Sequence, residues 1–244
     1  MFCGLATLVL LTLTLSNCSK ETGTSSSGSG MNLKIAATNQ IFNIPVPNIP
    51  DPTIDPGSVN TYKPFVRWDT ANIVISKVLF EAVPMGSIQI GEAKEQLIFT
   101  GPKFIDLFSA GNILPNLTIP PGQYKEIEFK IYANKSDAGD KPVFYLSGRY
   151  QNSSGTAIPI IIDITDDVVI TAEKNGVTLT FNSTVSRSGM IRIYLDKLFS
   201  SILPQDLNPI VGPGGIIISA TSNPELYKQI LLRLSSDGAF EGRQ

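Results

Sequence analysis

The segment that most constrains the fold of this chain is the run of residues 113–133, which reads ILPNLTIPPGQYKEIEFKIYA. In its second half, the apolar residues Ile127, Phe129 and Ile131 alternate with charged residues. A strand with one buried face has this period of two. The prolines and the glycine of residues 120–122 are typical of a turn, because proline fixes φ and cannot donate to a sheet. The segment therefore predicts two short strands joined by a Pro-Pro-Gly turn.

The composition extends this prediction to the rest of the chain. The 244 residues include 20 Gly and 17 Pro, and 16% of them are charged. Many short strands need many turns, so these values favour one all-β unit of β-sandwich size over two helical domains. We expect an antiparallel β-sandwich over residues 65–244, in which the Asn-Gly pair at 175–176 forms a hairpin turn. Apolar residues at helical spacing predict one C-terminal helix over residues 223–235, packed on the sandwich.

The N-terminus has the pattern of an export signal. Leu5 to Leu15 form an apolar run of the length found in signal peptides, and they are followed by Leu15-Ser16-Asn17-Cys18. This tetrapeptide resembles the lipobox of bacterial lipoproteins. The resemblance implies a signal peptide over residues 1–17 and a Cys18 that carries acyl chains such as palmitate at the mature N-terminus. An ordinary secretory signal and a short buried element are the alternatives.

The segments between Cys18 and the predicted sandwich are polar and then rich in proline. Residues 18–30 contain mostly Ser, Thr and Gly, which predicts a flexible, lipid-anchored linker. Residues 31–64 begin with a strand and continue as an arm with six prolines between positions 45 and 64, which exclude a helix or a central strand. Cys3 and Cys18 are the only cysteines, so we expect the folded part to contain no disulfide.

Four further segments share a resemblance. They are Ile73 to Glu81, Ile105-Asp106-Leu107, Ile119 to Tyr124, and Gly176 to Phe181. Their order resembles that in bacterial lipoproteins that carry a poorly characterised envelope domain. The resemblance spans roughly Val66 to Leu198, and it implies a prealbumin-like or immunoglobulin-like sandwich on a bacterial cell envelope, with the lipid in the outer membrane. It implies no catalytic site.

Charge and histidine content narrow the function classes. The net charge is −2, so no excess of basic residues is present to neutralise the phosphates of a nucleic acid. The chain has no histidine, which removes the usual general base of Ser and Cys nucleophiles and the commonest nitrogen ligand of zinc. Chemistry based on carboxylates alone and on Ser-Lys pairs stays open, but a non-enzymatic protein is the expectation.

Three carboxylates form the candidate metal site. Asp163, Asp166 and Asp167 lie together in the sequence IIDITDDVVI, between two predicted strands. Calcium takes several hard oxygen ligands, and clustered carboxylates in a loop can supply them. The alternative is a solvated turn, because a tight turn also favours Asp.

Three aromatic residues form the candidate ligand-binding surface. Trp68, the only tryptophan, and Tyr145 and Tyr150 can stack on a sugar ring if they are exposed in a row. The alternative is that they are half-buried strand residues.

These observations predict a non-enzymatic envelope lipoprotein that serves as a binding or structural surface module. Its partners would be the membrane, through the lipid on Cys18, and a protein or a glycan at the cell surface. The alternatives are a carbohydrate-binding or calcium-dependent adhesin domain and, third, a small hydrolase that uses carboxylates. We expect no nucleic-acid partner and no cofactor, apart from calcium in the adhesin alternative.

Overall fold

The computed structural model describes residues 29–46, 62–85, 96–109, 112–119, 122–181, 187–236 and 238–243. The predicted signal peptide, Cys18 and most of the predicted linker lie outside the described residues, as does the proline-rich stretch 47–61. The prediction of Cys18 as the lipidated residue is therefore carried by the sequence alone.

The described residues form strands for the most part. The strands are β1 (Ser29–Thr38), β2 (Ile41–Asn43), β3 (Phe65–Pro84), β4 (Gln96–Asp106), β5 (Asn112–Ile119), β6 (Gly122–Ala133), β7 (Phe144–Gln151), β8 (Ala157–Ile164), β9 (Val168–Phe181), β10 (Arg187–Tyr194), β11 (Ile216–Ser219) and β12 (Gly238–Arg243). The helices are α1 (Lys135–Ala138), η1 (Lys197–Phe199), α2 (Pro204–Leu207), η2 (Asn208–Ile210) and α3 (Pro224–Ser236). The protein is thus mostly β, as predicted.

The strands join into one curled, mixed sheet, so the prediction of a purely antiparallel sheet is wrong. The order of neighbours is β11-β8-β7-β3-β6-β9-β12-β10-β1-β5, and β2 and β4 pair with β3. Among the described strands, three pairs are parallel: β1 with β10, β8 with β11, and β9 with β12. Parallel neighbours need long crossover connections, and the segment between β8 and β11 includes two other strands and α2. Two separate facing sheets, as in a prealbumin-like or immunoglobulin-like sandwich, are not seen among the described strands.

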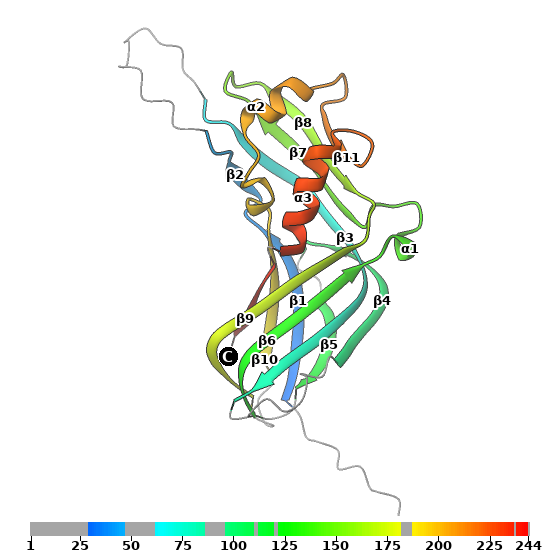
Figure 1. Cartoon of the computed structure of the whole chain (residues 1–244), viewed down its shortest axis with the longest axis vertical. Coiled ribbons are helices and arrows are strands. Elements are labelled where there is room, and N and C mark those ends of the chain that lie inside the picture. The colour runs from blue at the N-terminus through cyan, green and yellow to red at the C-terminus, as the bar shows by residue number, and fades with distance from the viewer. Residues whose placement is uncertain are drawn as a thin grey trace, which may run out of the picture.

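The long strand β3 holds the two parts of the sheet together. Along one edge, residues 65–73 pair with β7 and residues 77–84 pair with β6. Along its other edge, β3 pairs with β2 and then with β4. Figure 1 shows β7, β8, β11 and α2 at one end of β3, α1 near its middle, and the curled part with β6, β9 and β10 at the other end. β3 is therefore the strand on which both parts depend.

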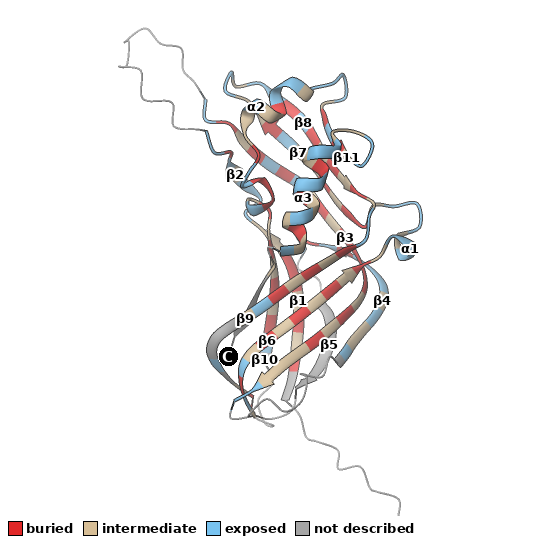
Figure 2. Cartoon of the chain, viewed as in Figure 1, coloured by how far each residue is buried: buried red, intermediate tan, exposed pale blue. Residues whose placement is uncertain are grey.

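The core follows the alternation read from the sequence. Ile127, Phe129 and Ile131 are fully buried, as predicted for β6. Each such side chain stabilises the fold by about 1.5–3 kcal/mol relative to an exposed position. The C-terminal helix is confirmed as α3, and its Tyr227 and Ile230 are buried. Figure 2 shows that α3 has both buried and exposed residues.

One local prediction was wrong. The Asn-Gly pair at 175–176 does not end a strand, because β9 runs through it and the register to β6 shifts between Tyr124 and Glu126 instead. The polar segment after β6 does not join a hairpin. It contains α1, and the strands on either side of it, β6 and β7, pair with different halves of β3.

Candidate functional site

The candidate site is built on a row of polar side chains that crosses four strands. Asn72 of β3 is the register partner of both Asp106 in β4 and Tyr145 in β7, and Tyr145 is in turn the partner of Asp163 in β8. Directly opposed residues of antiparallel strands lie on the same face. These four side chains therefore form one row on one face of the sheet.

The residues next to this row face the core. Ile73 is paired with Ile105 and Phe144, and Phe144 is paired with Ile164. All four are buried, with exposed fractions of 3% or less. A one-residue shift of register would move the polar row into this core, so packing fixes which side chains of these strands reach the surface.

The segment between β6 and β7 forms a wall beside the polar row, and hydrogen bonds attach it to the sheet at both of its ends. At its start, the Asn134 N–H donates to Oγ of Ser76 at 2.8 Å, and Ser76 is only 5% exposed. The next N–H, of Lys135, donates to Oδ1 of Asp167 at 2.7 Å. At its end, Val143 donates its N–H to the Ile164 carbonyl. These bonds hold the segment in place.

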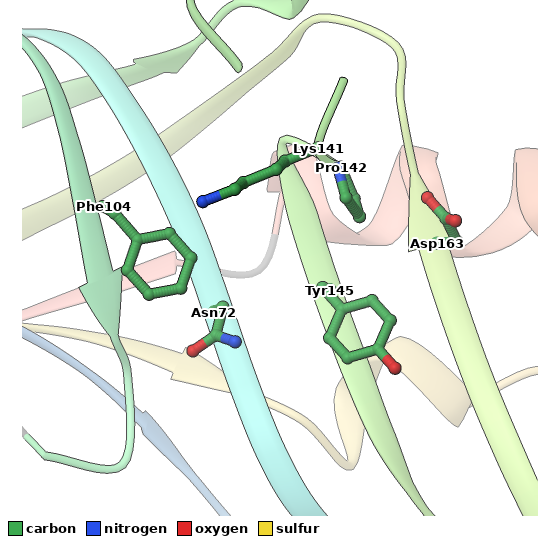
Figure 3. A pocket seen from close by; sticks show the side chains of 6 residues that line it. All are labelled: Asn72, Phe104, Lys141, Pro142, Tyr145 and Asp163. Atoms are coloured by element: carbon green, nitrogen blue, oxygen red, sulfur yellow. The ribbon is translucent and has the colours of Figure 1, made fainter. Parts of the chain in front are cut away.

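A cavity of about 360 Å³ lies between this wall and the polar row. It is lined by Asn72, Phe104, Lys141, Pro142, Tyr145 and Asp163. Figure 3 shows Phe104, Asn72 and Tyr145 on neighbouring strands, with Lys141 above them and Asp163 beyond Tyr145. The volume falls within the range of about 300–1,000 Å³ that is typical of small-molecule sites. Helix α3 lies behind these strands in the same view.

The charged groups of the cavity are not paired with each other. Nζ of Lys141 lies 5.6 Å from the centre of the Phe104 ring, which is 56% exposed. Oδ1 of Asp163 is buried and has no hydrogen-bond donor among the described residues. Burial raises the pKa of this carboxyl above its ordinary value, because a desolvated carboxylate is disfavoured.

Two of the three predicted aromatic residues are in the core. Trp68 and Tyr150 are both fully buried. The Trp68 ring centre lies 5.7 Å from that of Phe199, and the Tyr150 hydroxyl donates to Oδ1 of Asn208 at 2.9 Å. The exposed row of aromatics predicted from the sequence is therefore wrong for these two residues, because they fall on the inner face of their strands. Tyr145 is half-buried and lines the cavity.

The three predicted metal ligands do not point to one place. Asp163 lines the cavity, whereas Oδ2 of Asp166 accepts a hydrogen bond of 2.8 Å from the Tyr227 hydroxyl. Oδ1 of Asp167 accepts the N–H of Lys135, and Asp166 and Asp167 line a separate, open hollow. Within the described ranges, no three Asp, Glu, Cys or His residues are grouped as a metal site would require. A calcium site at these carboxylates stays a prediction without support from their positions.

Four lining residues were missed in the sequence. Asn72, Phe104, Lys141 and Pro142 belong to three separate segments, and none of those segments carries a binding motif. One signal was present for the tyrosines. Alternate residues of a strand share a face, so Tyr150 lies on the same face as the apolar Phe144 and Leu146, whereas Tyr145 lies on the opposite face. This alternation indicates that only Tyr145 faces outward.

Comparison with known proteins gives no further guidance to the site. No protein-family model, curated protein or solved structure matches this chain. Over the part of the chain that is described, no helix has the length and apolar character needed to cross a membrane. The function is therefore argued from the sequence pattern and from the geometry of the cavity.

Proposed function

We propose that this chain is a lipid-anchored, non-enzymatic binding module of a bacterial envelope. The observation that carries the proposal is Leu15-Ser16-Asn17-Cys18, directly after the apolar run that starts at Leu5. The thiol of Cys18 would carry a diacylglyceryl group, and its amine would become the mature N-terminus. The folded unit follows after a short Ser, Thr and Gly segment, with β1 beginning at Ser29.

The physics of lipid anchors supports stable attachment. Each buried methylene contributes about 0.8 kcal/mol, and one acyl chain gives only reversible membrane binding. Two chains on Cys18 would hold the protein at the membrane without a transmembrane segment. By analogy with the lipoproteins that the chain resembles, we place the anchor in the outer membrane.

The positions of the acidic residues favour binding over hydrolysis. Two carboxyls of the polar row have pKa values shifted in opposite directions, as in an acid and base pair. Burial raises the pKa of Asp163, whereas hydrogen bonds from the Ser109 hydroxyl and the Phe108 N–H lower the pKa of Asp106. However, three strand spacings of roughly 4.8 Å separate the two residues, or about 14 Å. Glycosidase carboxyls lie about 5–9.5 Å apart, so this pair is too distant.

One observation favours a carbohydrate-binding module as the second candidate. Tyr145 and Asp163, which the sequence suggested for two different kinds of site, are register partners and line the same cavity. An aromatic ring beside a carboxylate and an amide is a common lining for polar ligands with one apolar face. This candidate is compatible with the lipid anchor, because it specifies what the anchored module binds.

Intact mass of the protein extracted with detergent from membranes of an expressing diderm bacterium tests the anchor. We expect a chain that begins at Cys18 and carries the added mass of acyl groups. Cys18→Ala should abolish both the processing and the added mass. Cys3→Ala is the matched control, because Cys3 belongs to the segment that is removed, and it should leave the mature mass unchanged. An unmodified wild-type chain in the soluble fraction would refute the anchor.

A further inference from the structure

We propose that the cavity between β3, β4, β7 and β8 is a saccharide-binding site that holds one neutral sugar residue. This inference rests on the proposed function as a binding module and names the ligand of that module. The site consists of the two rings of Phe104 and Tyr145 and the polar groups of Asn72, Lys141 and Asp163.

The polar groups of the cavity are available to a ligand. The side chains of Asn72, Lys141, Tyr145 and Asp163 form no hydrogen bond or ion pair with other described residues, although all four line one cavity. Together they offer donors and acceptors: an amide has both, an ammonium only donates, and a carboxylate only accepts. The hydroxyl rim of a sugar also needs both kinds, since each hydroxyl donates one hydrogen bond and accepts others.

The apolar groups provide a surface for the C–H face of a sugar ring. Phe104 is 56% exposed even though it is a large apolar residue on a strand. Pro142 and the half-buried ring of Tyr145 extend this apolar surface on the other side of Asn72 (Figure 3). An exposed aromatic ring with polar groups around it matches a ligand that has one apolar face and a polar edge.

Charge and size select among small polar ligands. Lys141 and Asp163 contribute one positive and one negative charge, so the lining is balanced. A phosphate would meet the Asp163 carboxylate, and a divalent cation would meet the Lys141 ammonium, which disfavours both. The volume of about 360 Å³ is near the lower limit for small-molecule sites, which suits a single ring better than a long chain.

The backbone of the site is in place before a ligand arrives. The register of three paired strands fixes the backbone positions of Asn72, Tyr145 and Asp163. Lys141 and Pro142 directly precede Val143, whose N–H donates to the Ile164 carbonyl of the sheet. Because little ordering of the backbone is needed on binding, more of the contact energy is available as affinity.

Binding to the purified full chain in detergent tests the proposal. The probes are an array of immobilised oligosaccharides, followed by saturation-transfer NMR with the methyl glycosides of glucose, galactose, mannose and N-acetylglucosamine. We expect at least one of these sugars to bind. Phe104→Ala should weaken its binding about tenfold, because the stacking surface is lost. Asp163→Asn, which keeps the shape of the side chain, should weaken it several-fold.

Leu97→Ala is the matched control, because Leu97 is also an exposed apolar residue of β4, at 55% exposure, and does not line the cavity. It should leave sugar binding unchanged. The proposal is overturned if no sugar binds the wild type, or if binding survives both cavity variants. It is also overturned if glycylglycine binds the wild type as tightly as the sugar does and loses its binding in the Phe104 and Asp163 variants. The cavity would then be a site for zwitterions.

The two proposals fail in distinguishable ways. Sugar binding is measured in detergent and does not depend on acylation of Cys18, whereas the mass of the chain does not depend on the cavity. An acylated protein that binds no sugar refutes the saccharide site alone. A protein that binds sugar but carries no acyl group refutes the anchor and keeps the binding module.

Discussion

Replacing Gly148 by alanine should destabilise the protein strongly, because β3 and β7 approach each other too closely at this residue for a side chain. A Cβ built on Gly148 would lie 2.1 Å from the Arg67 carbonyl oxygen and 2.8 Å from Cα of Trp68. Both contacts are with backbone, so neither can be relieved by a rotamer change. The register of the two strands shifts between Trp68 and Thr70, directly at this contact. Glycine in a strand commonly marks such a close approach.

The expected cost follows from what must move. Relieving the overlap requires β3 to shift by about 1 Å at Trp68, which is fully buried and packs on Phe199. Overpacking in a core costs about 1–3 kcal/mol, and we expect the upper end because two hydrogen-bonded strands must separate. For a chain of this size, about 3 kcal/mol lowers the melting temperature by roughly 6–12 °C.

The assay is thermal and urea unfolding of the full chain in detergent, followed by circular dichroism. Gly214→Ala is the matched control, because a Cβ there meets nothing within 4 Å. We expect this variant to unfold like the wild type. If Gly148→Ala also unfolds within 1 °C of the wild type, a threshold on the order of the error of such a scan, the close contact of β3 with β7 is refuted.

Three further predictions concern polar groups near the cavity and its supporting wall. Ser76→Ala should cost about 1–2 kcal/mol in urea unfolding and speed amide exchange at Asn134, whose N–H loses its acceptor; unchanged exchange would contradict the attachment. Tyr227→Phe should cost about 1 kcal/mol, because its hydroxyl bonds Asp166; equal unfolding midpoints would contradict this. Because burial raises the pKa of Asp163 above 3.8, wild-type stability should fall relative to Asp163→Asn as pH rises from that value; parallel pH curves would argue against it.

The sequence pattern was most reliable where burial depends on local alternation. Ile127, Phe129 and Ile131 are buried because a strand places alternate residues on one face, and this holds whichever strand lies beside them. The helix α3 was predictable for a similar reason, since its buried Tyr227 and Ile230 recur at helical spacing. The same alternation along β7 would also have placed Tyr150 in the core and Tyr145 outside it.

The pattern failed where a short signal competed with a long partner strand. The Asn-Gly pair at 175–176 is a strong hairpin signal by itself. In the structure, β9 instead continues beside β6 from Val168 to Phe181, and the extra residues are absorbed as an irregularity in the register. The ladder with β6 supplies many more hydrogen bonds than a local turn does, so the tertiary pairing decided the local conformation.

The candidate site also combines features that a local pattern predicts with features that depend on tertiary pairing. Tyr145 and Asp163 were singled out in the sequence separately, one for a sugar and one for a metal. Their common cavity depends on the pairing of β7 with β8. The lining residues Asn72 and Phe104 depend in turn on the pairing of β3 with β4. Trp68 is as aromatic as Tyr145, but its position on the inner face leaves it no access to a ligand.

The sequence by itself determined that the chain forms alternating strands and one C-terminal helix, because those patterns reflect neighbours a few residues apart. It also carries the lipobox-like segment ending at Cys18, which is a local signal. Only the tertiary structure decided that the strands form one mixed sheet with β3 at its centre, and that Asn72, Tyr145 and Asp163 share a face. The physical reason is that strand pairing joins residues far apart in the chain, and the order of neighbours depends on how all buried faces pack together.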